Sequence, residues 1–273
     1  IWSFFWKTSI ADYEYIGRLF IPFTYLVSVF AICKLIKNQF FFYFTLTVIL
    51  FLHHDLFIFS GYQEYIIFSV LLILSRFIFF GEYFKNKVFF LLLISLSSII
   101  LIWTKDEGVF FLIFVLISLI VKFSKFRKEL FIYSAAVLLI ITFSYFIEYQ
   151  IKGDVNFQSS LDLNLVYSRL NLEYIIYFLF NLNLHLLIAL FKYPLIIICL
   201  LSFIVSINKK ILDSYDIASF LSYLFLFYLF IIAVYFSTPY ELNEMLANSL
   251  DRIVLQFSGY IIFPLIKLVN RYL

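Results

Sequence analysis

Long uninterrupted runs of apolar residues constrain this chain more than any other feature. Of its 273 residues, 64% are hydrophobic and 14% are charged, whereas a soluble domain is about half apolar and about a quarter charged. One soluble core has no room for so much apolar surface. We therefore predict an all-α integral membrane protein, a single polytopic domain over 1–273 with about nine transmembrane helices. The runs cover residues 16–33, 40–52, 65–80, 88–103, 109–121, 130–147, 194–207, 218–236 and 253–270.

The basic residues between these runs predict which loops face the cytoplasm, because membrane proteins concentrate Lys and Arg there. A further run, 172–191, carries Asn181, Asn183 and His185 in its middle. All five basic clusters fall on one side only if 172–191 does not cross, so we expect an outer interfacial or re-entrant helix there and a cytoplasmic C-terminus. The clusters are Lys34 with Lys37, Lys85 with Lys87, Lys122 with Lys125, Arg127 and Lys128, Lys209 with Lys210, and Lys267 with Arg271.

Acidic residues gather on the opposite side of this topology. Of the 17 Asp and Glu residues, 13 fall outside and 4 fall inside. Acids contribute little to topology, so the skew is independent of the basic clusters that set it. It indicates that the chemistry of the protein takes place at the outer face.

The sequence "WTKDEG" (103–108) places Lys105, Asp106 and Glu107 between two apolar runs. Residues 88–121 as one helix would be about 51 Å long, more than the hydrocarbon core of about 30 Å. We therefore predict two spans joined by a tight corner, with Gly108 supplying an unusual backbone angle. Charges at this depth are tolerated where they pair or line a wet cavity. A polar pocket is favoured over a solvated hairpin.

Other candidate residues lie in the remaining outer segments. Glu64 stands at the start of the run 65–80, directly after a turn signal at Gly61-Tyr62. His53, His54 and Asp55 have the ligand chemistry of a divalent metal site. Adjacent side chains rarely converge on one ion, so no metal or other cofactor is predicted, although a divalent metal stays open. Cys33 and Cys199 lie inside apolar runs and imply neither a disulfide nor a metal site.

The last outer segment precedes the final run. Ser237-Thr238-Pro239 is a favourable helix start, and Ser249 is expected to cap the last span. Arg252 then lies at the mouth of that span. It is either an interface anchor or a fixed cation that faces a phosphate at the membrane surface.

Four of these motifs, in this order, resemble one known group of enzymes. They are Glu14 with Arg18 as E-x-x-x-R, "GYQE" (61–64), "WTKDEG" (103–108) and "SLDRIVLQF" (249–257). The pattern is similar to the polytopic glycosyltransferases of the GT-C fold, which use polyprenyl-phosphate-linked sugars. Protein mannosyltransferase-like and aminoarabinose transferase-like enzymes belong to this group. In "GYQE" a Glu stands where that family usually has Asp.

The resemblance implies an enzyme of a bacterial-type inner (plasma) membrane, with its active face outside the cytoplasm. It would move a sugar from a polyprenyl-phosphate donor to a lipid, glycan or protein acceptor, and nucleic acid has no part in this. An acid acts as general base on the acceptor hydroxyl, and cations hold the phosphate leaving group. The implied roles are catalytic for Glu64, Asp106 and Glu107 and phosphate binding for Lys105 and Arg252. From side-chain chemistry alone, we expect Tyr62, Trp103 and Tyr240 to stack on sugar rings.

Two further classes of function stay open from the sequence. The family places its catalytic acid in a large outer loop after the first span, and this chain begins near the end of that loop. We therefore expect an N-terminal truncation, or else a non-catalytic membrane scaffold. A transporter or flippase of lipid-linked substrates is the other alternative. The chain has only 6 Gly and 4 Pro, whereas transporters favour helices broken by these residues.

Overall fold

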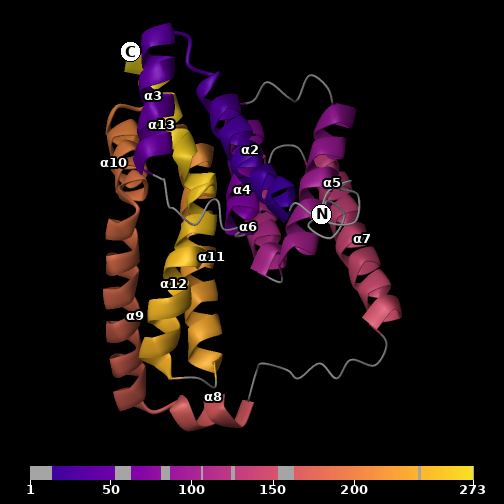
Figure 1. The fold of residues 1–273 in the computed structure, drawn as a ribbon, viewed down its shortest axis with the longest axis vertical. Helices are drawn as coiled ribbons and strands as arrows, with labels where there is room; N and C mark the ends of the chain where they lie inside the picture. The colour runs from indigo at the N-terminus through magenta and orange to yellow at the C-terminus, as the bar shows by residue number, and fades with distance from the viewer. Residues whose placement is uncertain are drawn as a thin grey trace. The chain divides into compact units, whose positions relative to one another are not determined.

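A computed structural model describes residues 14–52, 63–80, 87–105, 107–123, 127–152, 163–238 and 241–272. These residues are almost entirely helical and form no strand, which confirms the all-α class (Figure 1). The chain divides into two compact units, described here in turn. The first comprises residues 1–82, 193–212 and 255–273, and the second comprises residues 83–192 and 213–254.

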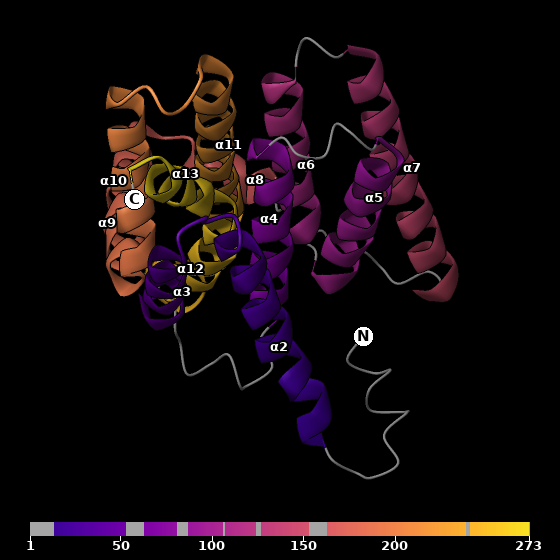
Figure 2. The same ribbon diagram turned by 90° about the horizontal axis from the view of Figure 1, so that it is seen from above.

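In the first unit, helix α2 packs beside α4 and against α3, and α10 packs against α13 (Figure 2). Aromatic rings fill the space between α2 and α4, where the Tyr25 ring lies 5.3 Å from that of Tyr65 and 5.4 Å from that of Phe68. The elements are α2 (Glu14–Cys33), α3 (Gln39–Leu52), α4 (Glu64–Phe79), α10 (Pro194–Asn208), the 3-10 helix η3 (Tyr260–Ile262) and α13 (Phe263–Tyr272).

The predicted run 253–270 is not one straight helix. Helix α12 (Leu242–Ser258) ends just before Gly259, and the chain then bends by 51° into residues Tyr260–Tyr272. A Cβ atom at Gly259 would run into the backbone of Phe68 on α4. The bend therefore lies where the two backbones touch, and only glycine fits there.

The second unit is built around an antiparallel pair, α6 and α11. The contacts run in opposite directions along the two helices: Phe111 lies beside Phe227, Ser118 bonds to Ser219, and Lys122 pairs with Asp216. Helices α5 and α7 lie side by side in both views (Figures 1 and 2). The elements are α5 (Lys87–Thr104), α6 (Glu107–Lys122), α7 (Arg127–Lys152), α8 (Leu163–Arg169), α9 (Leu172–Lys192), α11 (Ser214–Ser237) and most of α12.

Fewer helices are long enough to cross a bilayer than the nine predicted. Within the described residues, α9 and α11 qualify by length and hydropathy, and the bent pair of α12 with residues 260–272 raises the number from 2 to 3. The apolar runs do become helices, but α3 has 14 residues and α10 has 15. At 1.5 Å per residue, 15 residues cover about 22 Å, short of about 30 Å of hydrocarbon.

The outer interfacial or re-entrant helix expected at 172–191 is also not what the structure contains. Helix α9 is continuous and runs antiparallel to α11. The Phe178 ring lies 5.2 Å from that of Phe236, and Tyr228 donates a hydrogen bond to Asn183. By length and hydropathy, α9 is itself a candidate membrane span.

The polar residues within α9 bond within their own helix. The side-chain amides of Asn181 and Asn183 donate to the carbonyls of Tyr177 and Leu179 in their own helix, at 2.8 and 2.7 Å. An amide that bonds to the preceding turn is less costly in an apolar environment. These two asparagines are therefore compatible with a transmembrane helix.

Candidate functional site

The predicted corner at "WTKDEG" is confirmed. Helix α5 ends at Thr104 and α6 begins at Glu107, and the Gly108 N–H donates to the Lys105 carbonyl at 2.9 Å. Gly108 does not supply an unusual backbone angle, because it lies within α6. Instead, a Cβ atom there would collide with the backbone of Leu101. The glycine lets α5 and α6 approach closely, which positions the charges of the corner.

Helix α11 carries a buried tyrosine, Tyr235, near the corner between α5 and α6. The Tyr235 side chain is fully buried, and Glu107, Asp251 and Arg252 are all close enough to act electrostatically on its hydroxyl. Glu107 is half-buried in the first turn of α6, where the helix dipole favours an acid. Glu107 and Arg252, two residues predicted to act together, therefore share one neighbourhood.

Ser249 links α11 to α12 at this point. Its Oγ donates to the Met245 carbonyl at 2.8 Å and lies 2.7 Å from the Tyr235 hydroxyl. Since the serine has one proton to donate, Tyr235 donates to Ser249. Ser249 lies in the interior of α12. The prediction that it caps the last span is therefore wrong.

Asp251 makes two contacts next to Arg252. One of its oxygens pairs with Lys192 at the end of α9, and the other accepts the backbone N–H of Arg252 at 2.8 Å. The Arg252 side chain is exposed. Lys105, half-exposed, is the third cation of this unit near the corner. We call Glu107, Tyr235, Ser249, Asp251, Arg252 and Lys192 the corner cluster.

Sequence reasoning missed three features of the corner cluster. They are Tyr235, the hydrogen bond that Ser249 makes with it, and Lys192. A tyrosine in an aromatic run carries no distinguishing signal, because this chain has 21 Tyr and 39 Phe. The signal for Lys192 was present, since it is a single cation at the end of an apolar helix. Its partner Asp251 is distant in sequence, and only the fold brings them together.

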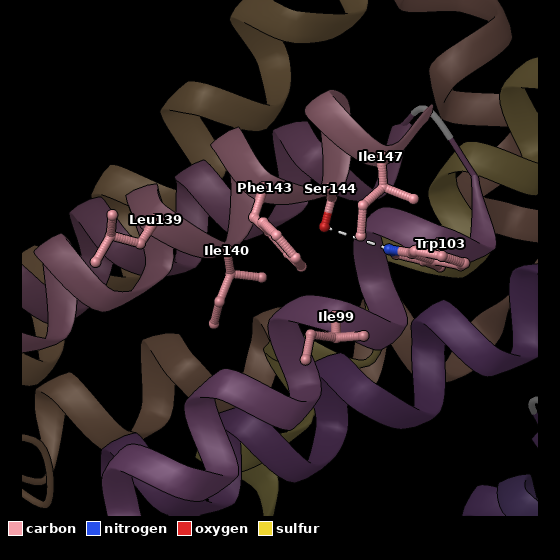
Figure 3. Close-up of a pocket in the computed structure, with 7 residues that line it drawn as sticks. All are labelled: Ile99, Trp103, Leu139, Ile140, Phe143, Ser144 and Ile147. Atoms are coloured by element: carbon pink, nitrogen blue, oxygen red, sulfur yellow. Dashed lines mark hydrogen bonds between the residues drawn. The ribbon is translucent and has the colours of Figure 1, made fainter. Parts of the chain in front are cut away.

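Trp103 lines a groove of about 450 Å³ between α5 and α7 (Figure 3). Figure 3 shows its indole at one end of the groove, with the N–H directed to the Ser144 hydroxyl at 3.3 Å, and Leu139 at the other end. Apart from Ser144, the lining is apolar: Ile99, Trp103, Leu139, Ile140, Phe143 and Ile147. This lining suits a hydrocarbon chain better than the sugar ring predicted to stack on Trp103.

The other predicted residues are placed as follows. Glu64 belongs to the first unit, where it begins α4 as predicted and is 1% exposed. Tyr62, Asp106, Tyr240 and the possible ligands at 53–55 lie outside the described residues. Within the described ranges, His, Cys, Asp and Glu form no group of three or more that could hold a metal ion. Cys33 and Cys199 are both buried free thiols.

No protein-family model matches the chain, and neither does any curated protein or solved structure. The resemblance to GT-C glycosyltransferases therefore rests on the four sequence motifs. The corner cluster and the groove are the structural features that bear on this resemblance.

Proposed function

We propose that this protein is a membrane glycosyltransferase. It moves a sugar from a polyprenyl-phosphate-linked donor to a lipid, glycan or protein acceptor. In this proposal the fold is GT-C-like and has more membrane spans than the two or three found among the described helices. The proposal also places the active face on the outer side of a bacterial-type inner membrane, as the resemblance to GT-C enzymes implies.

The corner cluster is the observation that carries this proposal. Sugar transfer from a lipid phosphate needs a cation for the leaving phosphate and an acid for the proton of the acceptor hydroxyl. Arg252 suits the phosphate, because a guanidinium binds phosphate oxygens through two parallel hydrogen bonds. Lys105 is the second cation, and Glu107 is the nearby acid. Glu64 belongs to the first unit, and its role as an acid is proposed from the sequence motif alone.

The groove beside Trp103 supports a donor carried on lipid. It follows directly along α5 from the corner that holds Lys105, so a chain in the groove would have its phosphate near a cation. Trp is typical of the interface between hydrocarbon and headgroups. The corner and the groove together suit an amphiphile with an anionic head and a long apolar tail.

A transfer assay with the full chain in lipid nanodiscs tests the proposal. Polyprenyl phosphates carrying different radiolabelled monosaccharides serve as donors, and a membrane extract supplies acceptors. We expect Arg252→Ala and Lys105→Ala to abolish transfer. Lys209→Ala, which also removes one positive charge but lies outside the site, is the control and should keep transfer. Wild-type transfer by both site variants would refute the assignment. Absence of transfer by the wild type with every donor would refute the proposal itself.

One observation favours a second candidate, a transporter or flippase of lipid-linked substrates. Transporters often use broken helices near the middle of the membrane, and the 51° bend at Gly259 breaks the α12 segment. This candidate predicts that the reconstituted protein moves a fluorescent polyprenyl-phosphate lipid between leaflets without consuming it. Movement without transfer would favour it over the enzyme.

A further inference from the structure

The exposed side of α9 carries one continuous apolar stripe. Large hydrophobic side chains that are at least 45% exposed recur every three or four positions, so they share one face of the helix. They are Leu172, Ile176, Phe180, Leu184, Ile188 and Phe191. At 1.5 Å per residue the stripe is about 29 Å long, which matches about 30 Å of hydrocarbon in a bilayer. The stripe therefore fits a helix that crosses the hydrocarbon from one side to the other.

The charged residues of α9 agree with this placement. Its Asp, Glu, Lys and Arg residues are Glu173 in the first turn and Lys192 in the last, and both are exposed. A charge in the middle of the hydrocarbon is costly, whereas a charge at its boundary reaches water. The start of α9 therefore marks one surface of the membrane.

Helix α8 lies at that surface and runs along it. It ends at Arg169, and α9 begins at Leu172. Figure 1 shows α8 lying across the ends of α9 and α11 rather than continuing either of them. Among the described residues, α9 and α11 are the two single helices long and apolar enough to cross a membrane. A helix set crosswise at their ends follows the plane of the bilayer.

The one charged residue of α8 is turned toward the protein. Arg169 is half-buried, and its Nη1 donates to the carbonyls of Phe236 and Thr238 at 2.8 and 2.7 Å. Its guanidinium carbon also lies 5.3 Å from the centre of the Tyr174 ring. Carbonyls at the end of a helix lack partners within that helix. Arg169 therefore satisfies the end of α11 and ties α8 to a candidate span.

The large side chains exposed next to Arg169 are apolar or aromatic. Tyr167 is 72% exposed and Leu170 is 58% exposed, and the stripe of α9 begins just after them at Leu172. No exposed charge lies between Tyr167 and Leu172. Tyrosine is enriched where hydrocarbon meets headgroups, because its ring is apolar and its hydroxyl is polar. The exposed surface of α8 thus continues the lipid-facing stripe into the boundary of the bilayer.

We propose that α8 is an interfacial helix whose partner is the lipid surface. It lies between hydrocarbon and headgroups, with Tyr167 and Leu170 inserted among the lipids and Arg169 holding it to α11. Amphipathic helices bind membranes in this way, with the apolar side about 5–10 Å deep. The interfacial element is then α8 and not the 172–191 helix expected from the sequence. This inference does not depend on the proposed sugar transfer.

Nitroxide labels on single cysteines of the full chain in lipid nanodiscs test the proposal. The two buried thiols, Cys33 and Cys199, are first replaced by Ala. Oxygen concentrates in hydrocarbon and a nickel chelate stays in water, so the ratio of their collision rates with the label reports depth. We expect this ratio to rise severalfold in the order Leu170→Cys, Ile176→Cys, Phe180→Cys. All three positions are exposed, so the labels leave the packing intact.

Two reference labels complete the depth profile. Phe191→Cys, at the far end of the stripe, should return to a low ratio, and Lys209→Cys, exposed in a turn, gives the value for water. A Leu170 label with the value of Lys209 would overturn the proposal, and so would one with the value of Phe180. Low collision rates with both reagents at Leu170 would mean that another protein copy covers α8, which also overturns it. Equal ratios at Ile176 and Phe180 would show that α9 does not cross.

Arg169→Gln tests what holds α8 in place. It removes the cation that ties α8 to the end of α11, so the Leu170 label should move toward the value for water. Lys192→Gln removes one charge at the other end of α9 and is the matched control, with no change expected at Leu170. An unchanged ratio in Arg169→Gln would remove Arg169 from the anchor. Since no sugar donor is present, these results stand apart from the transfer assay.

Discussion

The two ends of the α6–α11 pair use charge in different ways. At the Lys122 end, one ammonium pairs with both Asp213 and Asp216, and its side chain is only 12% exposed. At the Glu107 end, Glu107, Asp251 and Arg252 act electrostatically on the buried Tyr235 hydroxyl, and Arg252 is exposed. The first arrangement satisfies its charges internally and joins two helices. The second leaves Arg252 exposed beside the ion pair of Asp251 with Lys192.

The neighbouring hydrogen bonds support this difference. Near the Lys122 end, Ser118 donates to the Ser219 carbonyl at 3.0 Å and Ser219 donates to the Ser118 carbonyl at 2.9 Å. Asp213 also caps α11 by accepting the Asp216 N–H at 2.6 Å. Polar groups at that end therefore bond mostly to one another. We expect substitutions there to affect stability and substitutions in the corner cluster to affect activity.

The largest effect is expected from Lys122→Ala. It leaves the buried Asp216 carboxylate without its cation, which should lower the free energy of unfolding by about 3–5 kcal/mol. Thermal unfolding in nanodiscs measures this. Asp213→Asn is the control, because that side chain is 59% exposed and Asn also caps helices well. If Lys122→Ala lowered the free energy of unfolding by less than about 1 kcal/mol, the ion pair would not hold α6 and α11 together.

Arg252→Ala should have the opposite profile. Removing a donor that stabilises charge in a transition state typically lowers turnover by about 10²–10³-fold. Unfolding should be little changed, because the side chain is exposed. Transfer rate and melting temperature, measured on one preparation, separate the two effects. A variant that loses stability in proportion to activity would show that Arg252 is structural.

Gly108→Ala tests how the corner is positioned. The added Cβ meets the Leu101 backbone, so α5 and α6 must separate, at about 1–3 kcal/mol. We expect a lower melting temperature together with reduced transfer, because Lys105 and Glu107 move with the corner. Gly259→Ala creates a similar collision in the first unit and provides the comparison. Equal stability of wild type and Gly108→Ala would contradict the close approach.

The smallest effects should come from the bond between Tyr235 and Ser249. Tyr235→Phe removes the donor and should cost about 0.5–1.5 kcal/mol. Ser249→Ala leaves the tyrosine hydroxyl buried without its acceptor and should cost more, about 1–3 kcal/mol. The order of the two melting temperatures is the measurement. The reverse order would contradict the assignment of tyrosine as donor.

Local pattern predicted the positions of the helices well, but overestimated how many of the described helices are long enough to span a bilayer. The apolar runs 40–52, 65–80 and 194–207 became α3, α4 and α10 nearly residue for residue. The corner between α5 and α6 was predicted from length alone, since one helix over both runs is too long for a bilayer. The run 253–270 failed as a straight span because its bend depends on contact between Gly259 and Phe68, which no local pattern records.

Chain order and hydropathy alone determined that this protein is helical and rich in apolar surface. They also identified Glu107 and Arg252 as candidates. Only the tertiary structure decided that both act electrostatically on Tyr235, that Lys192 pairs with Asp251, and that aromatic rings of α9 contact α11. The physical reason is register. A side chain's partner on another helix depends on how far the two helices slide past each other, and that offset is set by the packing of many residues together.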